Sequence, residues 1–165
     1  MYKLFITLFL LTNSQAFYLN KPIYFNRNQL LKSHFSSVST QLKDKDLLIQ
    51  SLYDMNENFN IIDEPTIVRG YNNVEVLADV VIRQETGIDI GFTLNGDVYE
   101  MVTDLQFWNQ SVPVEVFLER LSMKYSYNSI ISSSKEEGYV TNYVKNNQED
   151  GTIEIEISRY DFCEY

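Results

Sequence analysis

Hydrophobic and polar residues alternate with a period of two between residues 74 and 103, which predicts a run of antiparallel strands. Asn95-Gly96 is typical of a two-residue hairpin turn, in which both central residues take positive φ. The turn therefore predicts the register of this hairpin. Counting outward from it pairs Phe92 with Tyr99 and Ile90 with Met101.

A second turn, at Glu85-Thr86-Gly87, predicts the register of the preceding hairpin. Counting outward pairs Ile82 with Ile90, Val80 with Phe92 and Ala78 with Leu94. The two registers agree, and they collect apolar side chains on one face of the sheet: Ala78, Val80, Ile82, Ile88, Ile90, Phe92, Leu94, Tyr99 and Met101. The other face carries Asp79, Arg83, Asp89, Thr93 and Glu100, with Arg83 opposite Asp89 in a favourable cross-strand pair.

Helical spacing of apolar residues predicts two helices on either side of these strands. Asp44 is a suitable cap for a helix that runs to about Met55. Pro113 fits the first turn of a helix that continues to Glu137, after which Gly138 ends it.

Three further stretches are predicted to be strands. Residues 33–42 alternate weakly, residues 59–69 are interrupted at Pro65, and the tail forms a hairpin in which Ile153, Ile155 and Ile157 face one way after a loop over 146–151. Together the elements predict an α+β fold: an antiparallel sheet with helices packed on one face, in a single domain.

Charge divides the chain sharply. Residues 1–32 carry four basic residues and no acid, a net charge of +4, whereas residues 33–165 carry 9 basic and 23 acidic residues, a net charge of −14. The acidic balance excludes a typical nucleic-acid-binding protein, because such a protein needs a positive face to displace counterions. It favours instead an unknown protein partner with a basic face.

The basic segment is typical of a targeting leader. Lys3 precedes an apolar run from Leu4 to Leu11, and Ser14-Gln15-Ala16 places small residues where a signal peptidase cuts. The apolar run is too short for a helix that crosses a bilayer, so no stable membrane span is expected in the mature chain.

We therefore expect a signal peptide-like segment over residues 1–16, a transit-like basic segment over 17–32 and one α+β domain over 33–165. Four alternatives remain open. Residues 1–16 form a buried N-terminal strand or helix in the first and a retained membrane anchor in the second. In the third the protein is secreted with Phe17 as its first residue, and in the fourth residues 1–32 result from an upstream-extended start codon.

Few residues carry chemistry of their own. A single cysteine, Cys163, excludes an intramolecular disulfide framework and a multi-cysteine metal site, and a single histidine, His34, disfavours a zinc site. Glu154 and Glu156 lie about 7 Å apart on one side of a predicted strand, which suits two-carboxylate chemistry but is also the pattern of a solvated strand face. We expect no catalytic residue, no metal and no cofactor.

Two places are candidates for binding. In Arg69-Gly70-Tyr71 a glycine that permits an unusual turn lies between a cation and an aromatic ring, a combination that suits an anion or a partner peptide. The alternative is a loop that merely joins two strands. Trp108 is either an interface anchor or a core residue, while Phe107 is favoured for the core.

Several short motifs resemble one known family. They are Ser33-His34-Phe35-Ser36, Arg69-Gly70-Tyr71, Val81 to Glu85, Gly87 to Phe92, Asp104 to Trp108, Phe117-Leu118, Lys124 to Tyr127 and Glu149-Asp150-Gly151. In this order they resemble the hypothetical chloroplast reading frame thirty-five family of cyanobacteria and algal plastids, from about Ser33 to Tyr160. Asn128 stands where the family pattern has histidine, and Tyr160 where it has tryptophan.

The resemblance implies a plastid protein of unknown function and brings no activity, cofactor or partner. We expect a non-enzymatic binding or assembly module that is imported into the plastid through the two-part leader. The alternatives are a small-ligand-binding protein or enzyme that uses carboxylates near Arg69-Gly70-Tyr71, and a secreted protein. An enzyme there predicts a deep pocket that holds an acid with a raised pKa.

Overall fold

A computed structural model describes residues 3–8, 35–56, 58–71, 75–146 and 153–159. Most of the predicted leader, together with His34 and Cys163, lies outside the described residues. The described residues gather into two compact units. One unit runs to Asn128, and the other contains residues 3–8 and the described residues from Ser129 onward.

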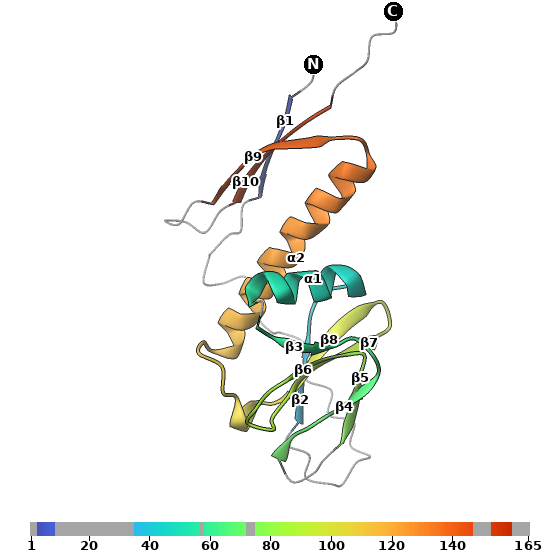
Figure 1. The fold of residues 1–165 in the computed structure, drawn as a ribbon, viewed down its shortest axis with the longest axis vertical. Helices are drawn as coiled ribbons and strands as arrows, with labels where there is room; N and C mark the ends of the chain where they lie inside the picture. The colour runs from blue at the N-terminus through green and yellow to red at the C-terminus, as the bar shows by residue number, and fades with distance from the viewer. Residues whose placement is uncertain (1–2, 9–34, 57, 72–74, 147–152, 160–165) are drawn as a thin grey trace, which may run out of the picture. The chain divides into compact units, whose positions relative to one another are not determined.

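The larger unit is built on a five-stranded antiparallel sheet with the strand order β2-β8-β7-β6-β3 (Figure 1). Its strands are β2 (Phe35–Ser39), β3 (Asn60–Ile62), β6 (Val80–Arg83), β7 (Ile90–Asn95) and β8 (Val98–Asp104). A separate two-stranded sheet joins β4 (Thr66–Val68) to β5 (Val76–Ala78). The predicted strand over 59–69 is thus divided near Pro65 into β3 and β4, which enter different sheets.

Two helices cover one face of the five-stranded sheet. Helix α1 (Lys45–Met55) begins at the predicted cap, where Asp44 Oδ1 accepts a hydrogen bond from the Leu47 N–H at 2.9 Å. Helix α2 (Val114–Glu136) is followed by Gly138, whose φ of 80° ends the helix as predicted. The α+β class, with helices packed on an antiparallel sheet, is therefore confirmed.

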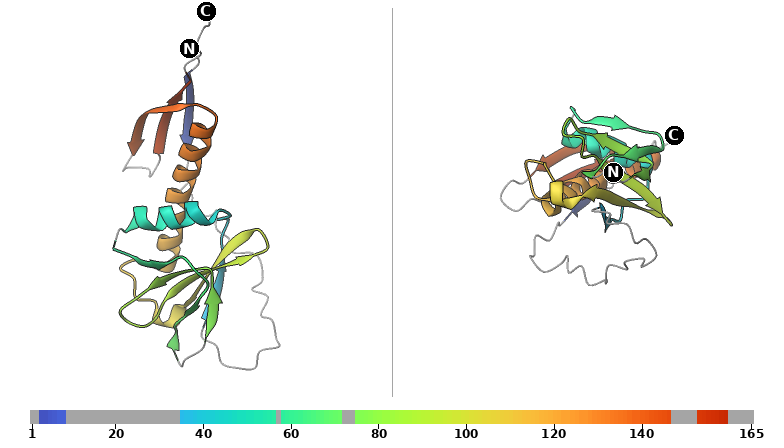
Figure 2. Two further views of the ribbon diagram at one scale, coloured as in Figure 1. Left: turned by 45° about the vertical axis from the view of Figure 1, so that its right-hand side comes forward. Right: turned by 90° about the horizontal axis from the view of Figure 1, so that it is seen from below.

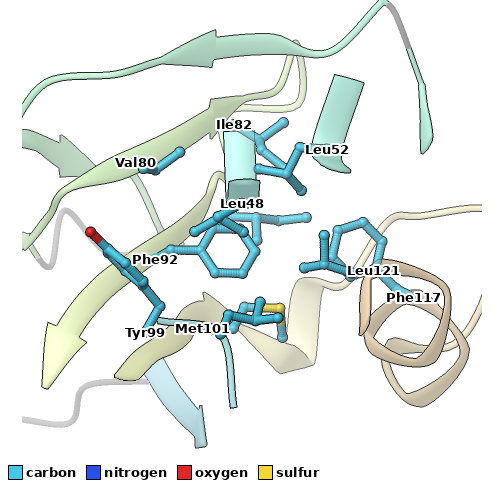
Figure 3. Packing of buried hydrophobic residues seen from close by; sticks show 11 residues of the cluster. Leu48, Leu52, Val80, Ile82, Phe92, Tyr99, Met101, Phe117 and Leu121 are labelled. Carbon is cyan, nitrogen blue, oxygen red and sulfur yellow. The ribbon is translucent and has the colours of Figure 1, made fainter. Parts of the chain in front are cut away.

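The helices and the sheet enclose the main hydrophobic core. Phe92 points into its middle, between Leu48 of α1 and Met101 of β8 (Figure 3). Phe117 and Leu121 of α2 close the cluster from another side. The buried members are Leu42, Leu48, Leu52, Val80, Ile82, Ile90, Phe92, Tyr99, Met101, Phe117 and Leu121.

The opposite face of the sheet is covered by the β4–β5 hairpin. Val68, Ala78 and Val81 are buried there in a second, smaller cluster. A Cβ added to Gly91 would lie 2.4 Å from Val68 Cγ2 and 2.9 Å from Ala78 Cβ. The hairpin therefore packs directly on the backbone of β7.

The prediction that Ala78 shares the helix-covered face is wrong, because the strand is interrupted at Asp79 between β5 and β6. Asp79 Oδ2 accepts a hydrogen bond from the Leu94 N–H at 2.7 Å, and the Asp79 N–H donates to the Phe92 carbonyl oxygen at 2.9 Å. This residue reverses the alternation of side chains, so that Ala78 joins Val81 on the other face.

One of the two predicted registers is confirmed. Val80 pairs with Phe92 and Ile82 with Ile90, as expected. The third predicted pair is wrong, because Ala78 pairs with Thr66 of β4 and not with Leu94. In the next hairpin, however, Phe92 pairs with Met101 and Asn95 with Val98, so Gly96 and Asp97 form the turn and the predicted register is wrong by two positions. A shift of two keeps every side chain on its face. Leu94, predicted to be on the buried face, is 48% exposed at the end of β7.

The smaller unit contains a three-stranded antiparallel sheet with the order β1-β10-β9 (Figure 2). Strands β9 (Val140–Asn146) and β10 (Ile153–Ser158) form the predicted tail hairpin. Ile153, Ile155 and Ile157 are buried, in agreement with the predicted alternation. The third strand, β1 (Lys3–Leu8), comes from the segment that the sequence assigns to a leader.

Candidate functional site

A fully buried carboxylate, Asp89, lies just before β7 and organises the loop that contains Arg69. Arg69 donates to it in a fork, from Nε to Oδ2 at 2.9 Å and from Nη2 to Oδ1 at 2.8 Å. Arg83, at the end of β6, donates from Nη1 to Oδ2. The predicted Arg83–Asp89 pair is therefore present, and Arg69 joins it from twenty residues away.

Backbone groups complete the shell around Asp89. The N–H of Arg69 donates to Oδ2 at 2.9 Å, and the N–H of Gln84 donates to Oδ1 at 3.1 Å. The Asp89 N–H donates in return to the Arg69 carbonyl oxygen at 2.9 Å. The two arginines also donate to carbonyl oxygens, Arg69 to that of Gln84 and Arg83 to that of Ile67, both at 2.9 Å. These bonds fix the end of β4 to the β6–β7 hairpin.

The environment of Asp89 keeps its carboxyl group ionised. Burial by itself would raise the pKa, but hydrogen bonds from Arg69, Gln84 and Arg83 outweigh it, and the pKa of Asp89 is lowered. The same contact raises the pKa of Arg69, chiefly through its hydrogen bond to Asp89. An enzyme at this loop would need an acid with a raised pKa. Asp89 is not that acid, because its pKa is lowered and its ionised carboxylate holds the loop in place.

Gly70 allows the loop to pass close to β2. A Cβ at this position would lie 2.5 Å from Cζ of Phe35, so the ring occupies the space that any other residue would fill. The next residue, Tyr71, directs its N–H toward Oδ2 of the buried Asp104 at 3.4 Å. Oδ1 of Asp104 accepts from the Gln106 N–H at 3.2 Å and caps the short helix η2 (Leu105–Phe107).

This shared carboxylate places two aromatic rings together. Tyr71 and Phe107 are stacked, with their ring centroids 4.5 Å apart and their planes inclined by 22°. Tyr71 is 48% exposed and Phe107 is 39% exposed. Phe107 thus lies at the surface, whereas the sequence favoured it for the core. We call this the aromatic pair.

Trp108 packs against the main core, the position for which the sequence favoured Phe107. Its ring lies edge-on to Phe117 at 5.4 Å and packs against the main core. Its Nε1 donates to the Val112 carbonyl oxygen at 2.7 Å. Of the four predicted binding residues, the structure therefore joins Arg69, Gly70 and Tyr71 in one loop and places Trp108 in the packing of the core.

Other candidate positions show structural contacts. Asn128, where the family pattern has histidine, is buried and donates from Nδ2 to Ser51 Oγ at 3.1 Å and to Asp54 Oδ2 at 2.8 Å. A shallow hollow of about 200 Å³ lies nearby, lined by Asp54, Met55, Arg120, Met123 and Lys124. Within the described part of the chain, no three histidine, cysteine or acidic side chains are grouped to hold a metal ion. None of the described helices is long and apolar enough to cross a membrane.

Sequence reasoning missed three members of this site: the anchoring role of Asp89, the cap at Asp104 and the exposure of Phe107. Only the first left a signal, because the cross-strand register places Arg83 beside Asp89. The contacts from Arg69 to Asp89 and from Tyr71 to Asp104 join residues 20 and 33 positions apart, and no local pattern reports them.

Residues 51–155 match the family described as protein of unknown function (DUF1257), which is more than half of the chain. The chain belongs to the DUF1257 family. The matched DUF1257 region contains the Arg69 loop, both buried carboxylates and the aromatic pair. It also contains all of α2 and the second half of α1, Ser51–Met55.

Relatives of this DUF1257 protein extend the match. Uncharacterized protein ycf35 of Guillardia theta is 43% identical over 130 residues, which cover 78% of this chain and 98% of the relative. The ycf35 protein of Pyropia yezoensis is 36% identical over 130 residues, and the match covers 79% of this chain and 99% of the relative. The ycf35 protein of Cyanophora paradoxa is 28% identical over 128 residues, and the match covers 78% of this chain and 98% of the relative. The expected membership of the hypothetical chloroplast reading frame thirty-five family is confirmed. No solved structure matches the chain.

Proposed function

We propose that this protein is a plastid binding or assembly module without catalysis of its own, and that the aromatic pair is where its partner docks. The observation that carries the proposal is the stack of two exposed rings. Tyr71 lies on the loop that the buried Asp89 holds, and Phe107 lies at the end of η2. Aromatic side chains supply large contact areas with little rotamer freedom to lose, and they are common anchors of interfaces.

The hydrogen bonds that hold Arg69 and Tyr71 in place support binding rather than turnover. Asp89 is saturated by Arg69, Arg83 and two backbone N–H groups, so its carboxylate is not poised to exchange protons. A loop ordered before the partner arrives loses less entropy on association. The hollow beside Asp54 is lined by other residues than the Arg69 loop, and no observation at the loop favours the small-ligand or enzyme alternative.

Charge supports a partner with a basic face. Residues 33–165 carry a net charge of −14. Exposed acidic side chains are spread over the described surface, at Asp44, Asp46, Asp54, Asp63, Glu64, Glu75, Glu85, Asp97, Glu115, Glu119, Glu136 and Glu137. Such a field steers a basic partner during diffusion, and the aromatic pair supplies a short-range contact.

The test is capture of partners from plastid stroma with the tagged full chain at low salt. The Tyr71→Ala/Phe107→Ala variant removes the aromatic pair, and Tyr53→Ala is the matched control because Tyr53 is 45% exposed on α1. We expect a reproducible basic partner that both the wild type and the control retain and the double variant loses. Raised salt should weaken the capture. A partner set that the double variant retains unchanged contradicts the proposal.

The location rests on the name of the relatives and on the two-part leader. We expect residues 1–16 to direct the protein into the secretory route and to be removed there. Residues 17–32 would then carry it across the plastid envelopes and be removed inside the plastid. N-terminal sequencing of the protein purified from the cells that make it decides between this route, secretion with Phe17 as the first residue, and retention of the segment. A fluorescent fusion of residues 1–32 that leaves the cell supports secretion instead.

A further inference from the structure

Strand β10 has a neighbour on each side, and one of them comes from the predicted leader. Lys3–Leu8 pairs with Ile153–Ser158 in an uninterrupted antiparallel register, from Lys3 opposite Ser158 to Leu8 opposite Ile153. The other neighbour, β9, is joined to β10 through the chain as a hairpin. Removal of the leader would therefore expose the backbone N–H and C=O groups along one whole edge of β10.

The matches to the relatives are too short to include β1 together with β10. The match to each of the three relatives above spans about 130 residues and covers 98% or more of the relative. The stretch from Lys3 to Ser158 is longer than that, so such a match cannot contain both β1 and β10. The family match itself extends into β10, to residue 155. Because the family match includes the first residues of β10, β1 is the strand for which we infer that these relatives have no counterpart.

We infer that the β10 edge is a strand-acceptor site, closed by Lys3–Leu8 in the precursor and open to an extended segment of a partner protein after the leader is removed. The inference rests on the leader part of the proposed function and not on the aromatic pair. Main-chain hydrogen bonds along the edge would provide the affinity, and the alternating side chains of β10 the selectivity.

The side chains of β10 define the segment that fits. Ile153, Ile155 and Ile157 are buried on one face, and Glu154 and Glu156 alternate with them. In the register of β1, Leu4, Ile6 and Leu8 fall opposite the three isoleucines, and Phe5 and Thr7 fall opposite the two glutamates. A fitting segment therefore alternates aliphatic residues with neutral or basic ones.

A second copy of β10 does not fit this edge. Residues directly opposite in an antiparallel pair share a face, so a self-pairing that keeps the isoleucines together also sets glutamates opposite glutamates. Like charges directly opposite destabilise a strand pair. A partner segment with lysine or arginine opposite Glu154 and Glu156 forms favourable charge pairs, whereas a second copy of β10 would set glutamates against each other.

The experiment opens the edge in the folded full chain. A site-specific protease sequence is placed at the predicted cleavage point after Ala16, the purified protein is cut, and the released fragment is removed by gel filtration. The probe is a fluorescent peptide of Lys3–Leu8 with added terminal lysines for solubility, and binding is read by fluorescence anisotropy. We expect the cut protein to stay folded and bind the peptide, while the uncut protein does not bind it.

Matched peptides test the mode of binding. Adjacent residues of a strand direct their N–H groups to opposite sides, so a peptide with Phe5→Pro and Ile6→Pro must lose one N–H that faces β10, and it should not bind. Replacing Phe5 and Thr7 by lysine should tighten binding relative to glutamate at the same positions, on the order of fivefold or more.

Three results overturn the inference: a cut protein that unfolds, a fragment that stays bound and does not exchange with excess peptide, and a folded cut protein that binds no peptide. The first two make β1 an integral strand. Retention of Lys3 in N-terminal sequencing of the natural protein would remove the leader proposal, whereas loss of peptide binding removes only the acceptor site, so the two failures are distinguishable.

Discussion

The two faces of the five-stranded sheet are covered in different ways. Helices α1 and α2 cover one face, and eleven buried residues form its apolar cluster. The β4–β5 hairpin covers the other, where, among the described residues, the buried apolar cluster consists of Val68, Ala78 and Val81. The ion pairs of Asp89 hold the end of the hairpin.

The two faces of the sheet therefore contribute differently: one mainly to stability, the other to the position of the Arg69 loop. Apolar burial is non-directional and increases with the area removed from water, so the helix-covered face provides most of the stability. Hydrogen bonds between ions are directional, and they set the path of the Arg69 loop and hence the place of Tyr71. The substitutions below test this division, starting with the largest expected loss.

Ile90→Asp should have the largest effect. Ile90 is buried in the main core opposite Ile82, and an aspartate there would leave a charge without a partner. We expect a loss of about 4 kcal/mol or more in the free energy of unfolding, which is a large fraction of the roughly 5 to 15 kcal/mol of an ordinary domain. Urea unfolding followed by circular dichroism measures it.

Thr93→Asp is the control for Ile90→Asp in the same strand. Thr93 is half-buried, and its Oγ1 donates to the Leu77 carbonyl oxygen at 3.2 Å on the hairpin side. Losing this bond and placing a carboxylate opposite Glu100 should together lower the free energy of unfolding by about 1 to 2 kcal/mol. Equal losses in the two variants would mean that the helix-covered face is not the one assigned here.

Asp89→Ala should come next. The substitution leaves Arg83, which is mostly buried, and the half-exposed Arg69 without their shared partner. We expect a loss of about 3 kcal/mol, at the lower end for a broken buried ion pair because water still reaches Arg69. Hydrogen exchange at Arg69 and Tyr71 should become faster. The exposed Asp97, which pairs with the exposed Lys43, is the control: Asp97→Ala should lower the free energy of unfolding much less than Asp89→Ala does and leave hydrogen exchange at Arg69 and Tyr71 unchanged.

The pH dependence of stability gives an independent measure of the same carboxylate. The pKa of Asp89 is lowered in the folded protein, so its stabilising contribution is complete above the unfolded value of about 3.9 and is lost as the pH falls through the folded pKa. The difference in unfolding free energy between the wild type and Asp89→Ala should therefore shrink below about pH 4. A difference that stays constant down to pH 2 would show that Asp89 is not held as an anion.

The sequence predicts the helix-covered face better than the hairpin-covered one. Alternation and helical spacing place most of the main core correctly, because these patterns depend on neighbours in the chain. The sequence predicts the turn at Asn95-Gly96, and it lies one residue later. Each side chain still lies on its predicted face, because the true register differs by two positions.

The hairpin-covered face depends on features that local patterns do not contain. The single irregular residue Asp79 moves Ala78 to the other face. The bonds of Arg69 to Asp89 and of Tyr71 to Asp104 depend on how distant segments pack, and so does the exposure of Phe107. Arg69, Gly70 and Tyr71 could be chosen as candidates from their residue types alone, but their partners could not.

Gly91→Ala is the smallest change and the sharpest test of the contact between the hairpin and the sheet. The new Cβ would lie 2.4 Å from Val68 Cγ2 and 2.9 Å from Ala78 Cβ, so the hairpin must move outward. Overpacking of this kind should lower the free energy of unfolding by about 1 to 3 kcal/mol, although alanine is otherwise a harmless replacement in a strand.

Val68→Ala turns this expectation into a double-mutant cycle. By itself Val68→Ala leaves a cavity under the hairpin and should be destabilising. Combined with Gly91→Ala it removes the methyl group that the new Cβ would meet, so the double variant should lose less stability than the two single variants together. Strict additivity would mean that the hairpin does not rest on β7. In that case, the hairpin would be held against the sheet by the ion pairs of Asp89, the contacts of Val68 and Ala78 with Val81 and the bond from Thr93 to Leu77, without support from packing at Gly91.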